Sequence, residues 1–131
     1  MSLFTILSLY IAFRVKQYLC DFIFQTDWMA LTKGKPGMEG YKALFSHTIF
    51  HGVGTTAIAL VFAPALWWLG VVDFIVHSAV DRIKGLVTYK KGWSYTDRWF
   101  WWSFGLDQEA HNYTHLALIA YIVLHSGGLV P

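Results

Sequence analysis

The chain has 131 residues, a length that suits one domain and leaves no room for a second beside it. Hydrophobic residues make up 56% and charged residues 14%, which is too apolar for an ordinary small soluble domain. The formal charge of +2 is too weak to indicate a nucleic acid partner, and the single cysteine, Cys20, excludes an internal disulfide. Residues 43–72 and 110–131 contain no Asp, Glu, Lys or Arg, and each run supplies the roughly 20 residues that span a lipid bilayer. We therefore expect an all-α, polytopic membrane four-helix bundle.

Gly, Pro and basic stretches divide the apolar segments into predicted helices. These are residues 3–31, ending before the 33–37 turn; 41–63, ended by Pro64; 66–89; and 104–125. The first thirteen residues are uncharged but lack the charged region and cleavage site of a signal peptide, so we expect them in the mature protein. Arg14 and Lys16 interrupt the first helix, and either the helix leaves the apolar layer there or these cations face protein or lipid head groups.

Each predicted helix carries two polar residues four positions apart. The pairs are Asp21 and Gln25, His47 and His51, His77 and Asp81, and Asp107 and His111. Side chains at i and i+4 lie on one face of a helix, about 6 Å apart, so each pair directs two polar groups at one spot. Metal sites in helix bundles are built from carboxylates and histidines that project inward from facing helices. The spacing therefore predicts one shared polar centre.

Basic residues are concentrated in two of the three predicted connections. Lysines occupy the connection between the first and second helices, and Lys and Arg surround the link between the third and fourth. By the positive-inside rule, both connections lie in the cytoplasm and both termini lie outside an inner membrane. With a rise of ~1.5 Å per residue, the four polar pairs then meet at one depth near the cytoplasmic face. The segment 99–102, with three Trp and one Phe, is expected to form an interfacial aromatic belt.

Carboxylates that share one depth in a membrane require a cation, because each costs at least about 2.5 kcal/mol near the bilayer centre unless it is paired. The candidate ligands are Asp21, His47, His51, His77, Asp81, Asp107 and His111. This set suffices for one or two divalent ions, of which zinc fits best, with manganese and iron as alternatives. Taken singly, each residue can instead form only a hydrogen bond between helices.

Further polar residues beside the predicted ligands are candidates for binding substrate. They are Gln25, Lys33, Lys84 and Gln108. Lys84 can equally extend its ammonium group to the cytoplasmic interface. Asp73, one turn before His77, is a candidate to orient that imidazole. We expect His115 to pack in the core and His125 to lie near the outer interface.

Read in order, the polar motifs are CDFIFQTDWMA, a following lysine, H-x3-H, H-x3-D-x2-K and a late DQ-x2-H. Together they resemble the small bacterial and phage membrane family known as domain of unknown function 3307, from about Tyr18 to His111. The resemblance implies an architecture and a set of polar positions, but no activity. Members often carry a histidine one turn before the first Asp, where this chain has Gln17. More distantly, the pattern looks like the membrane-bound metal-dependent hydrolases grouped with zinc phospholipase C.

The function expected from these residues is metal-dependent hydrolysis of a phosphoester or lipid head group at the cytoplasmic face. One or two ions would lower the pKa of a bound water towards about 7, with Asp107 or Asp81 as the catalytic carboxylate. A structural metal, a bis-histidine haem site and an ion or proton pathway are the alternatives without hydrolysis. The surplus of Asp residues counts against haem. Substrate and oligomeric state stay open.

Overall fold

The computed structural model describes residues 1–126, which contain helices and helical turns but no strand. In chain order the elements are α1 (Leu3–Tyr18), a π-helical turn (Leu19–Ile23), α2 (Asp27–Thr32), α3 (Gly37–Phe62), a 3-10 turn (Pro64–Leu66), α4 (Leu69–Lys91) and α5 (Arg98–His125). The all-α prediction is confirmed over these residues. Five α-helices stand where the sequence predicted four, because the first predicted helix is divided.

The division of the first helix is the largest departure from the sequence prediction. After Tyr18 the backbone N–H of Phe24 donates to the carbonyl of Leu19, five residues back, at 2.8 Å. A π-helical turn contains one extra residue, and such turns are frequent at functional sites. The hydroxyl of Thr26 then caps α2 by accepting a hydrogen bond from the N–H of Met29 at 3.3 Å. Asp21 therefore lies inside an irregular turn and not on a regular helix face.

The remaining boundaries shift by smaller amounts. α3 ends at Phe62, before Pro64, as predicted. α4 begins later than expected because Pro64–Leu66 forms a 3-10 turn, and it ends at Lys91, just before Gly92, whose φ of 65° is left-handed. α5 begins at Arg98, so the aromatic segment 99–102 lies in the first turns of the helix and not in a connection.

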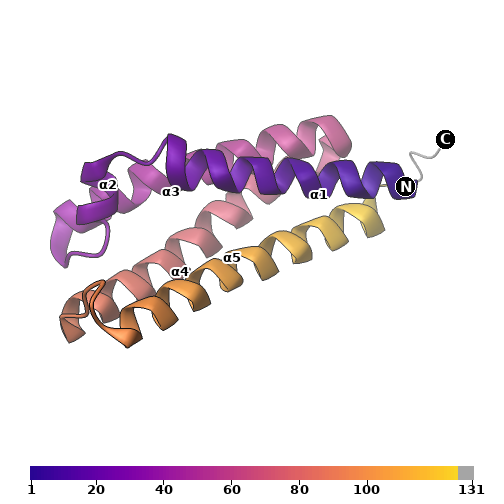
Figure 1. The fold of residues 1–131 in the computed structure, drawn as a ribbon. Helices are drawn as coiled ribbons and strands as arrows, with labels where there is room; N and C mark the ends of the chain where they lie inside the picture. The colour runs from indigo at the N-terminus through magenta and orange to yellow at the C-terminus, as the bar shows by residue number, and fades with distance from the viewer. Residues whose placement is uncertain (127–131) are drawn as a thin grey trace.

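Four long helices run side by side, with α3 against α4, α4 against α5, and α1 against both α3 and α5 (Figure 1). The short α2 and the connection between α4 and α5 lie at one end of the bundle, and the N-terminus and the end of α5 lie at the other (Figure 1). The guanidinium of Arg82 on α4 donates to the backbone oxygens of Lys33 at 3.3 Å and Lys35 at 2.7 Å. The two basic connections therefore share one end of the molecule.

Small residues let α3 and α4 approach closely. A Cβ on Gly70 would lie 2.5 Å from the backbone oxygen of Gly52 and 1.9 Å from the hydroxyl of Thr56. Further along the same interface, the hydroxyl of Ser78 donates to that of Thr48 at 2.8 Å. Small side chains and hydroxyl contacts are the usual means by which helices associate in lipid, where apolar surface alone supplies no driving force.

The interior is apolar at one end and polar over much of the rest. The buried apolar cluster consists of Leu9, Phe13, Ala63, Leu69, Leu118, Ile119 and Ile122. Large apolar side chains also face outward, and Phe4, Leu31 and Val61 are between 74% and 80% exposed. A polar interior with an extensive apolar exterior is unusual for a protein surrounded by water.

Two segments are long and apolar enough to cross a membrane, by length and composition alone: Leu3–Ile23 with 21 residues and Gly37–Phe62 with 26 residues. α4 and α5 do not meet the same criterion. Their sequences contain more charged and polar residues, including the buried Asp73, Asp81 and Asp107. The prediction of four spanning helices is therefore supported directly for only two segments.

Arg14 and Lys16, whose surroundings the sequence left open, both contact protein. Lys16 is only 5% exposed, and its ammonium pairs with the carboxylate of Asp73. The same ammonium donates to the hydroxyl of Thr55 at 3.0 Å and lies 3.0 Å from Nε2 of His115. The guanidinium of Arg14 lies 3.0 Å from the other ring nitrogen of His115. This ionic group joins α1, α3, α4 and α5.

Replacing Lys16 by Met should destabilise the protein, because it leaves the Asp73 carboxylate buried without its counter-charge. The expected loss is about 3–5 kcal/mol of unfolding free energy. Thermal or denaturant unfolding in detergent measures it, and adding Asp73→Asn should recover much of the loss. Lys42→Met is the matched control, since Lys42 forms an exposed pair with Glu39 at 3.2 Å. Equal stability of Lys16→Met and the wild type would contradict a stabilising role for this pair.

Candidate metal centre

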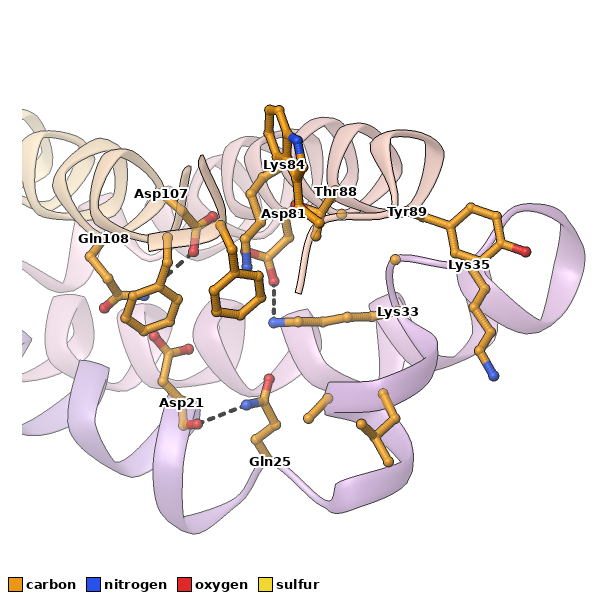
Figure 2. Close-up of a pocket in the computed structure, with 18 of the residues that line it drawn as sticks. Asp21, Gln25, Lys33, Lys35, Asp81, Lys84, Thr88, Tyr89, Asp107 and Gln108 are labelled. Atoms are coloured by element: carbon orange, nitrogen blue, oxygen red, sulfur yellow. Dashed lines mark hydrogen bonds and ion pairs between the residues drawn. The ribbon is translucent and has the colours of Figure 1, made fainter. Parts of the chain in front are cut away.

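All seven predicted ligands lie in one region of the bundle. Asp21 comes from the π-helical turn, His47 and His51 from α3, His77 and Asp81 from α4, and Asp107 and His111 from α5. The Asp21 side chain is 11% exposed, and the other six residues are at most 7% exposed. Figure 2 shows the three carboxylates reaching the same region from different elements. The i, i+4 spacing therefore located the centre on the three long helices α3, α4 and α5.

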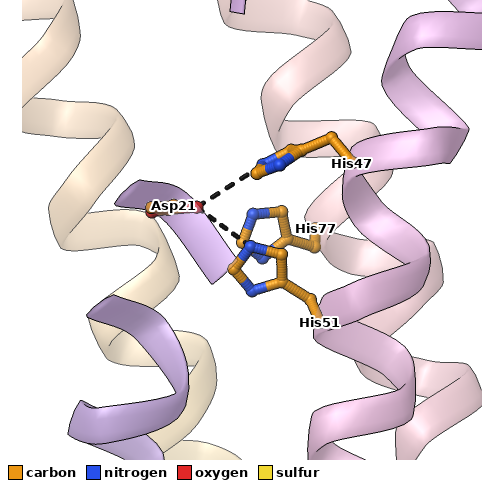
Figure 3. A group of neighbouring side chains, drawn as sticks. All are labelled: Asp21, His47, His51 and His77. Carbon is orange, nitrogen blue, oxygen red and sulfur yellow. Dashed lines mark hydrogen bonds and ion pairs between the residues drawn. The ribbon is translucent and has the colours of Figure 1, made fainter. Parts of the chain in front are cut away.

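The first group of possible ligands contains one carboxylate and three imidazoles. One ligand atom from each of Asp21, His47, His51 and His77 lies within 4.8 Å of the others (Figure 3). Oδ1 of Asp21 is 2.9 Å from Nε2 of His51 and 3.4 Å from Nε2 of His47. Four nitrogen and oxygen ligands at this spacing match the number that a tetrahedral zinc ion takes.

The second group contains His77, Asp81 and His111, whose ligand atoms also lie within 4.8 Å of one another. Oδ1 of Asp81 is 3.0 Å from Nε2 of His111, and Oδ1 of Asp107 is 3.4 Å from the same nitrogen. Nε2 of His47 is 3.4 Å from Oδ2 of Asp81, which links this group to the first. Because His77 belongs to both groups, the residues form one continuous cluster of possible metal ligands.

Three of the imidazoles form a stack across three helices. The ring centroids of His51 and His77 are 3.6 Å apart, and those of His77 and His111 are 3.7 Å apart with nearly parallel planes. Protonated rings at this separation would repel one another in an interior of low dielectric. Metal ions bind the neutral form of imidazole, and all three rings offer a nitrogen atom to the ligand groups.

Several buried polar atoms of the centre make no hydrogen bond within the described residues. They are both ring nitrogens of His47 and of His77, Nδ1 of His51 and of His111, and Oδ1 of Asp107. Buried polar atoms are nearly always partnered, and each one left unsatisfied costs about 1–3 kcal/mol. A divalent cation would accept lone pairs from such atoms and balance the three carboxylates. The residues present therefore fit a metal ion.

A cavity of about 620 Å³ lies beside the centre, towards the end of the bundle that carries the basic connections. Its lining includes the carboxylates of Asp21, Asp81 and Asp107 and all of the predicted substrate-binding residues, Gln25, Lys33, Lys84 and Gln108 (Figure 2). Its other lining residues are largely apolar or aromatic. The centre therefore borders a space large enough for a small molecule.

The predicted substrate-binding residues differ in what they contact. The ammonium of Lys33 pairs with Oδ2 of Asp81 at 2.8 Å, whereas that of Lys84 lies 5.5 Å from the ring centroid of Phe104. The amide of Gln108 donates to Oδ2 of Asp107 at 3.4 Å. Gln25 was expected to share a helix face with Asp21, but the chain leaves the helix between them. Its amide donates to the backbone oxygen of Asp21 at 3.0 Å.

The structure corrects the expectation for Asp73. Its carboxylate accepts hydrogen bonds from Lys16 and from Thr55, the latter at 2.5 Å, so it does not orient His77. His115 is buried against Phe13, with ring centroids 5.1 Å apart, and belongs to neither ligand group, so it packs in the core as expected.

Gln17 is a residue of the centre that reasoning from helix spacing left out. Its side-chain amide donates to the carboxylate of Asp21, one turn later in the chain, and Gln17 is 7% exposed. The sequence feature that could have identified Gln17 is its position four residues before Asp21, where members of the family often have histidine. His125 is exposed and lies 2.9 Å from the backbone oxygen of Tyr121, outside the centre.

These features define an all-helical protein with a buried histidine and aspartate centre that can bind metal. Residues 9–128 match the family described as "Protein of unknown function (DUF3307)", and the chain belongs to that family. This confirms the first resemblance drawn from the polar motifs. No curated protein and no solved structure matches the chain. The more distant resemblance to hydrolases of the zinc phospholipase C group stays a prediction.

We expect protein purified without a histidine tag to hold one or two divalent ions, measured by mass spectrometry of the dissolved metal. His77→Ala should lower the metal content most because His77 belongs to both ligand groups, whereas His51→Ala should affect one group. His125→Ala is the matched control. Chelation should also lower thermal stability, by about 2.7 kcal/mol if the free ion had been present at 100 times its Kd. Metal-free wild-type protein that is equally stable in chelator would overturn the metal assignment.

Proposed function

We propose that this protein is an integral membrane, metal-dependent hydrolase that acts on a phosphoester or lipid head group. The observation that carries the proposal is the position of the ligand cluster against a cavity whose wall also bears three lysines, Lys33, Lys35 and Lys84. An ion with a purely structural role needs no such access. A catalytic ion does need it, because substrate must reach an open coordination position.

When bound, one or two divalent ions would polarise a phosphoryl oxygen and bring the pKa of a water towards about 7. Hydrolysis forms a bond from the water oxygen to phosphorus and breaks the bond from phosphorus to the leaving oxygen. One proton of the water passes to Asp107 and from there to the leaving oxygen. Oδ1 of Asp107 is suited to this role because it makes no hydrogen bond in the described residues and Asp107 lines the cavity.

The other polar residues of the wall would hold the substrate in place. Lys33 and Lys84 supply positive charge for the anionic phosphoryl oxygens. The amide of Gln108, which donates to Oδ2 of Asp107, would keep that carboxylate oriented. Asp81 is 3% exposed and contacts Lys33, His47 and His111, so its role in the proposal is that of a ligand more than of a base.

The membrane location is supported by the distribution of charge in the helices. Three of the four carboxylates in α4 and α5 are buried: Asp73, Asp81 and Asp107 are between 0% and 7% exposed, whereas Glu109 is exposed. Charged residues that point into a bundle are compatible with a spanning helix, because lipid does not meet them. We therefore extend the membrane assignment from the two apolar segments to four spanning helices, with both basic connections in the cytoplasm and the termini outside.

Single-cysteine labelling in a Cys20→Ser background tests this topology. A membrane-impermeant maleimide should label Met38→Cys and Ser94→Cys only after the cytoplasmic face is opened, because these positions lie in or beside the two basic connections. Ser2→Cys should react in intact cells. Labelling of Met38→Cys and Ser94→Cys from opposite sides would refute the topology and the shared depth of the polar residues.

Asp107→Asn should abolish metal-dependent turnover across a panel of phosphodiesters and phospholipids. A general base contributes about 10²–10⁴ in rate, so kcat should fall by that order. The metal content, measured in parallel, should be retained, because Asp107, although predicted as a ligand, belongs to neither group of neighbouring ligand atoms. Lys84→Ala should act mainly on KM, since the lysine would bind substrate. Lys42→Ala removes the same charge from an exposed pair and is the control. No turnover by metal-loaded wild-type protein across the panel would leave a structural metal as the better interpretation.

A further inference from the structure

A second hollow lies between α4 and α5, on the outside of the bundle. Its volume is about 450 Å³, and its apolar lining is formed by Val80, Ile83, Val87, Trp99, Trp102 and Leu106. We call it the α4–α5 groove. Ile83 and Leu106 are 66% and 73% exposed, so the groove faces the surroundings of the protein. In the proposed membrane location, those surroundings are lipid chains.

The cavity of about 620 Å³ beside the ligand cluster is called the acidic cavity below, after Asp21, Asp81 and Asp107 in its wall. The groove and the acidic cavity share part of their walls. Lys84 on α4, Trp93 in the connection and Asp107 on α5 line both hollows. These residues therefore mark a boundary with apolar side chains on one side and the ligand cluster on the other. A molecule that occupies both hollows must have a polar end and an apolar end.

The charges at this boundary indicate the polarity of the occupant. The ammonium of Lys84 makes no ion pair within the described residues and lies 5.5 Å from the ring centroid of Phe104, which lines the acidic cavity. A phosphate group passing the boundary would meet this positive charge before it reached the candidate metal centre. The groove itself supplies almost only carbon atoms, which suit a hydrocarbon chain.

The aromatic residues place the groove at a suitable depth. The ring centroids of Trp93 and Trp99 are 6.2 Å apart, and those of Trp99 and Trp102 are 5.0 Å apart. This cluster lies beside the basic connection between α4 and α5. Tryptophan concentrates at the level of lipid head groups, so the groove begins at that level and continues along the hydrocarbon layer.

We infer that the substrate is a membrane lipid with a phosphoester head group, which enters sideways between α4 and α5. Its hydrocarbon chain lies in the α4–α5 groove, and its phosphate passes Lys84 into the acidic cavity. The inference rests on the proposed hydrolase function and narrows its substrate from phosphoesters in general to amphiphilic ones. A soluble phosphodiester would fill the acidic cavity and leave the groove without a role.

Filling the groove tests this inference. Ala110 lines the groove from α5, and Ala110→Phe should block a lipid chain while it replaces no residue of the ligand cluster. We expect kcat/KM for a long-chain phospholipid in mixed micelles to fall at least about tenfold, the size of effect a pocket shape change produces. Turnover of soluble bis(4-nitrophenyl) phosphate should stay within about twofold. Ala117→Phe makes the same change at an exposed position of α5 outside the groove and should alter neither rate.

Photolabelling of the wild-type protein gives a readout that needs neither turnover nor a variant. A phosphatidic acid with a diazirine midway along one acyl chain should label residues of α4 and α5 that line the groove, and unlabelled lipid should compete. Groove labelling without hydrolysis of any phosphoester would refute the proposed function and leave a lipid-binding site. Metal-dependent turnover of the soluble ester, with labelling outside the groove or with equal lipid turnover by Ala110→Phe, would overturn the inference. Labelling that is blocked because a second copy of the chain covers the groove, shown by crosslinking between copies, would also overturn the inference.

Discussion

The structure depends on how its buried carboxylates are compensated. Asp73 is compensated within the protein, because the ammonium of Lys16 and the hydroxyl of Thr55 both donate to it. The carboxylates of the centre face imidazoles, and Lys33 pairs with one of them. Imidazole balances a negative charge only when it is protonated or when both groups bind the same cation. Asp73 has a charged partner in Lys16, although its Oδ1 makes no hydrogen bond within residues 1–126. The centre leaves several imidazole nitrogens and one carboxylate oxygen without partners in the same range, and these atoms could bind an ion.

This difference separates two roles for polar residues in an apolar protein. The Lys16 group joins four helices and lies away from the acidic cavity, so it acts as a fixed connection between α1 and its neighbours. The histidine and aspartate centre borders the cavity and is built from four elements as well. Both groups place charged and polar side chains inside the bundle, whereas its outer surface is largely apolar. Lipid around the bundle would make that arrangement favourable.

The positions of the two hollows indicate the route by which substrate would reach the candidate metal centre. Substrate would approach from the membrane through the α4–α5 groove, and its phosphate would meet Lys84 before the ligand cluster. The π-helical turn has a matching role on the opposite wall, since it carries Asp21 to the centre and lets the chain turn away into α2.

The sequence by itself determined the helical class, the family and most of the centre, because helix geometry places residues four positions apart on one face. That rule located the pairs on α3, α4 and α5, but it failed for Asp21 and Gln25, where a π-helical turn changes the spacing. Only the tertiary structure decided that Lys16 meets Asp73, which lies 57 positions away. It alone also decided that both hollows share Lys84. Spacing along a helix constrains contacts within it, whereas contacts between helices follow from packing that no local pattern specifies.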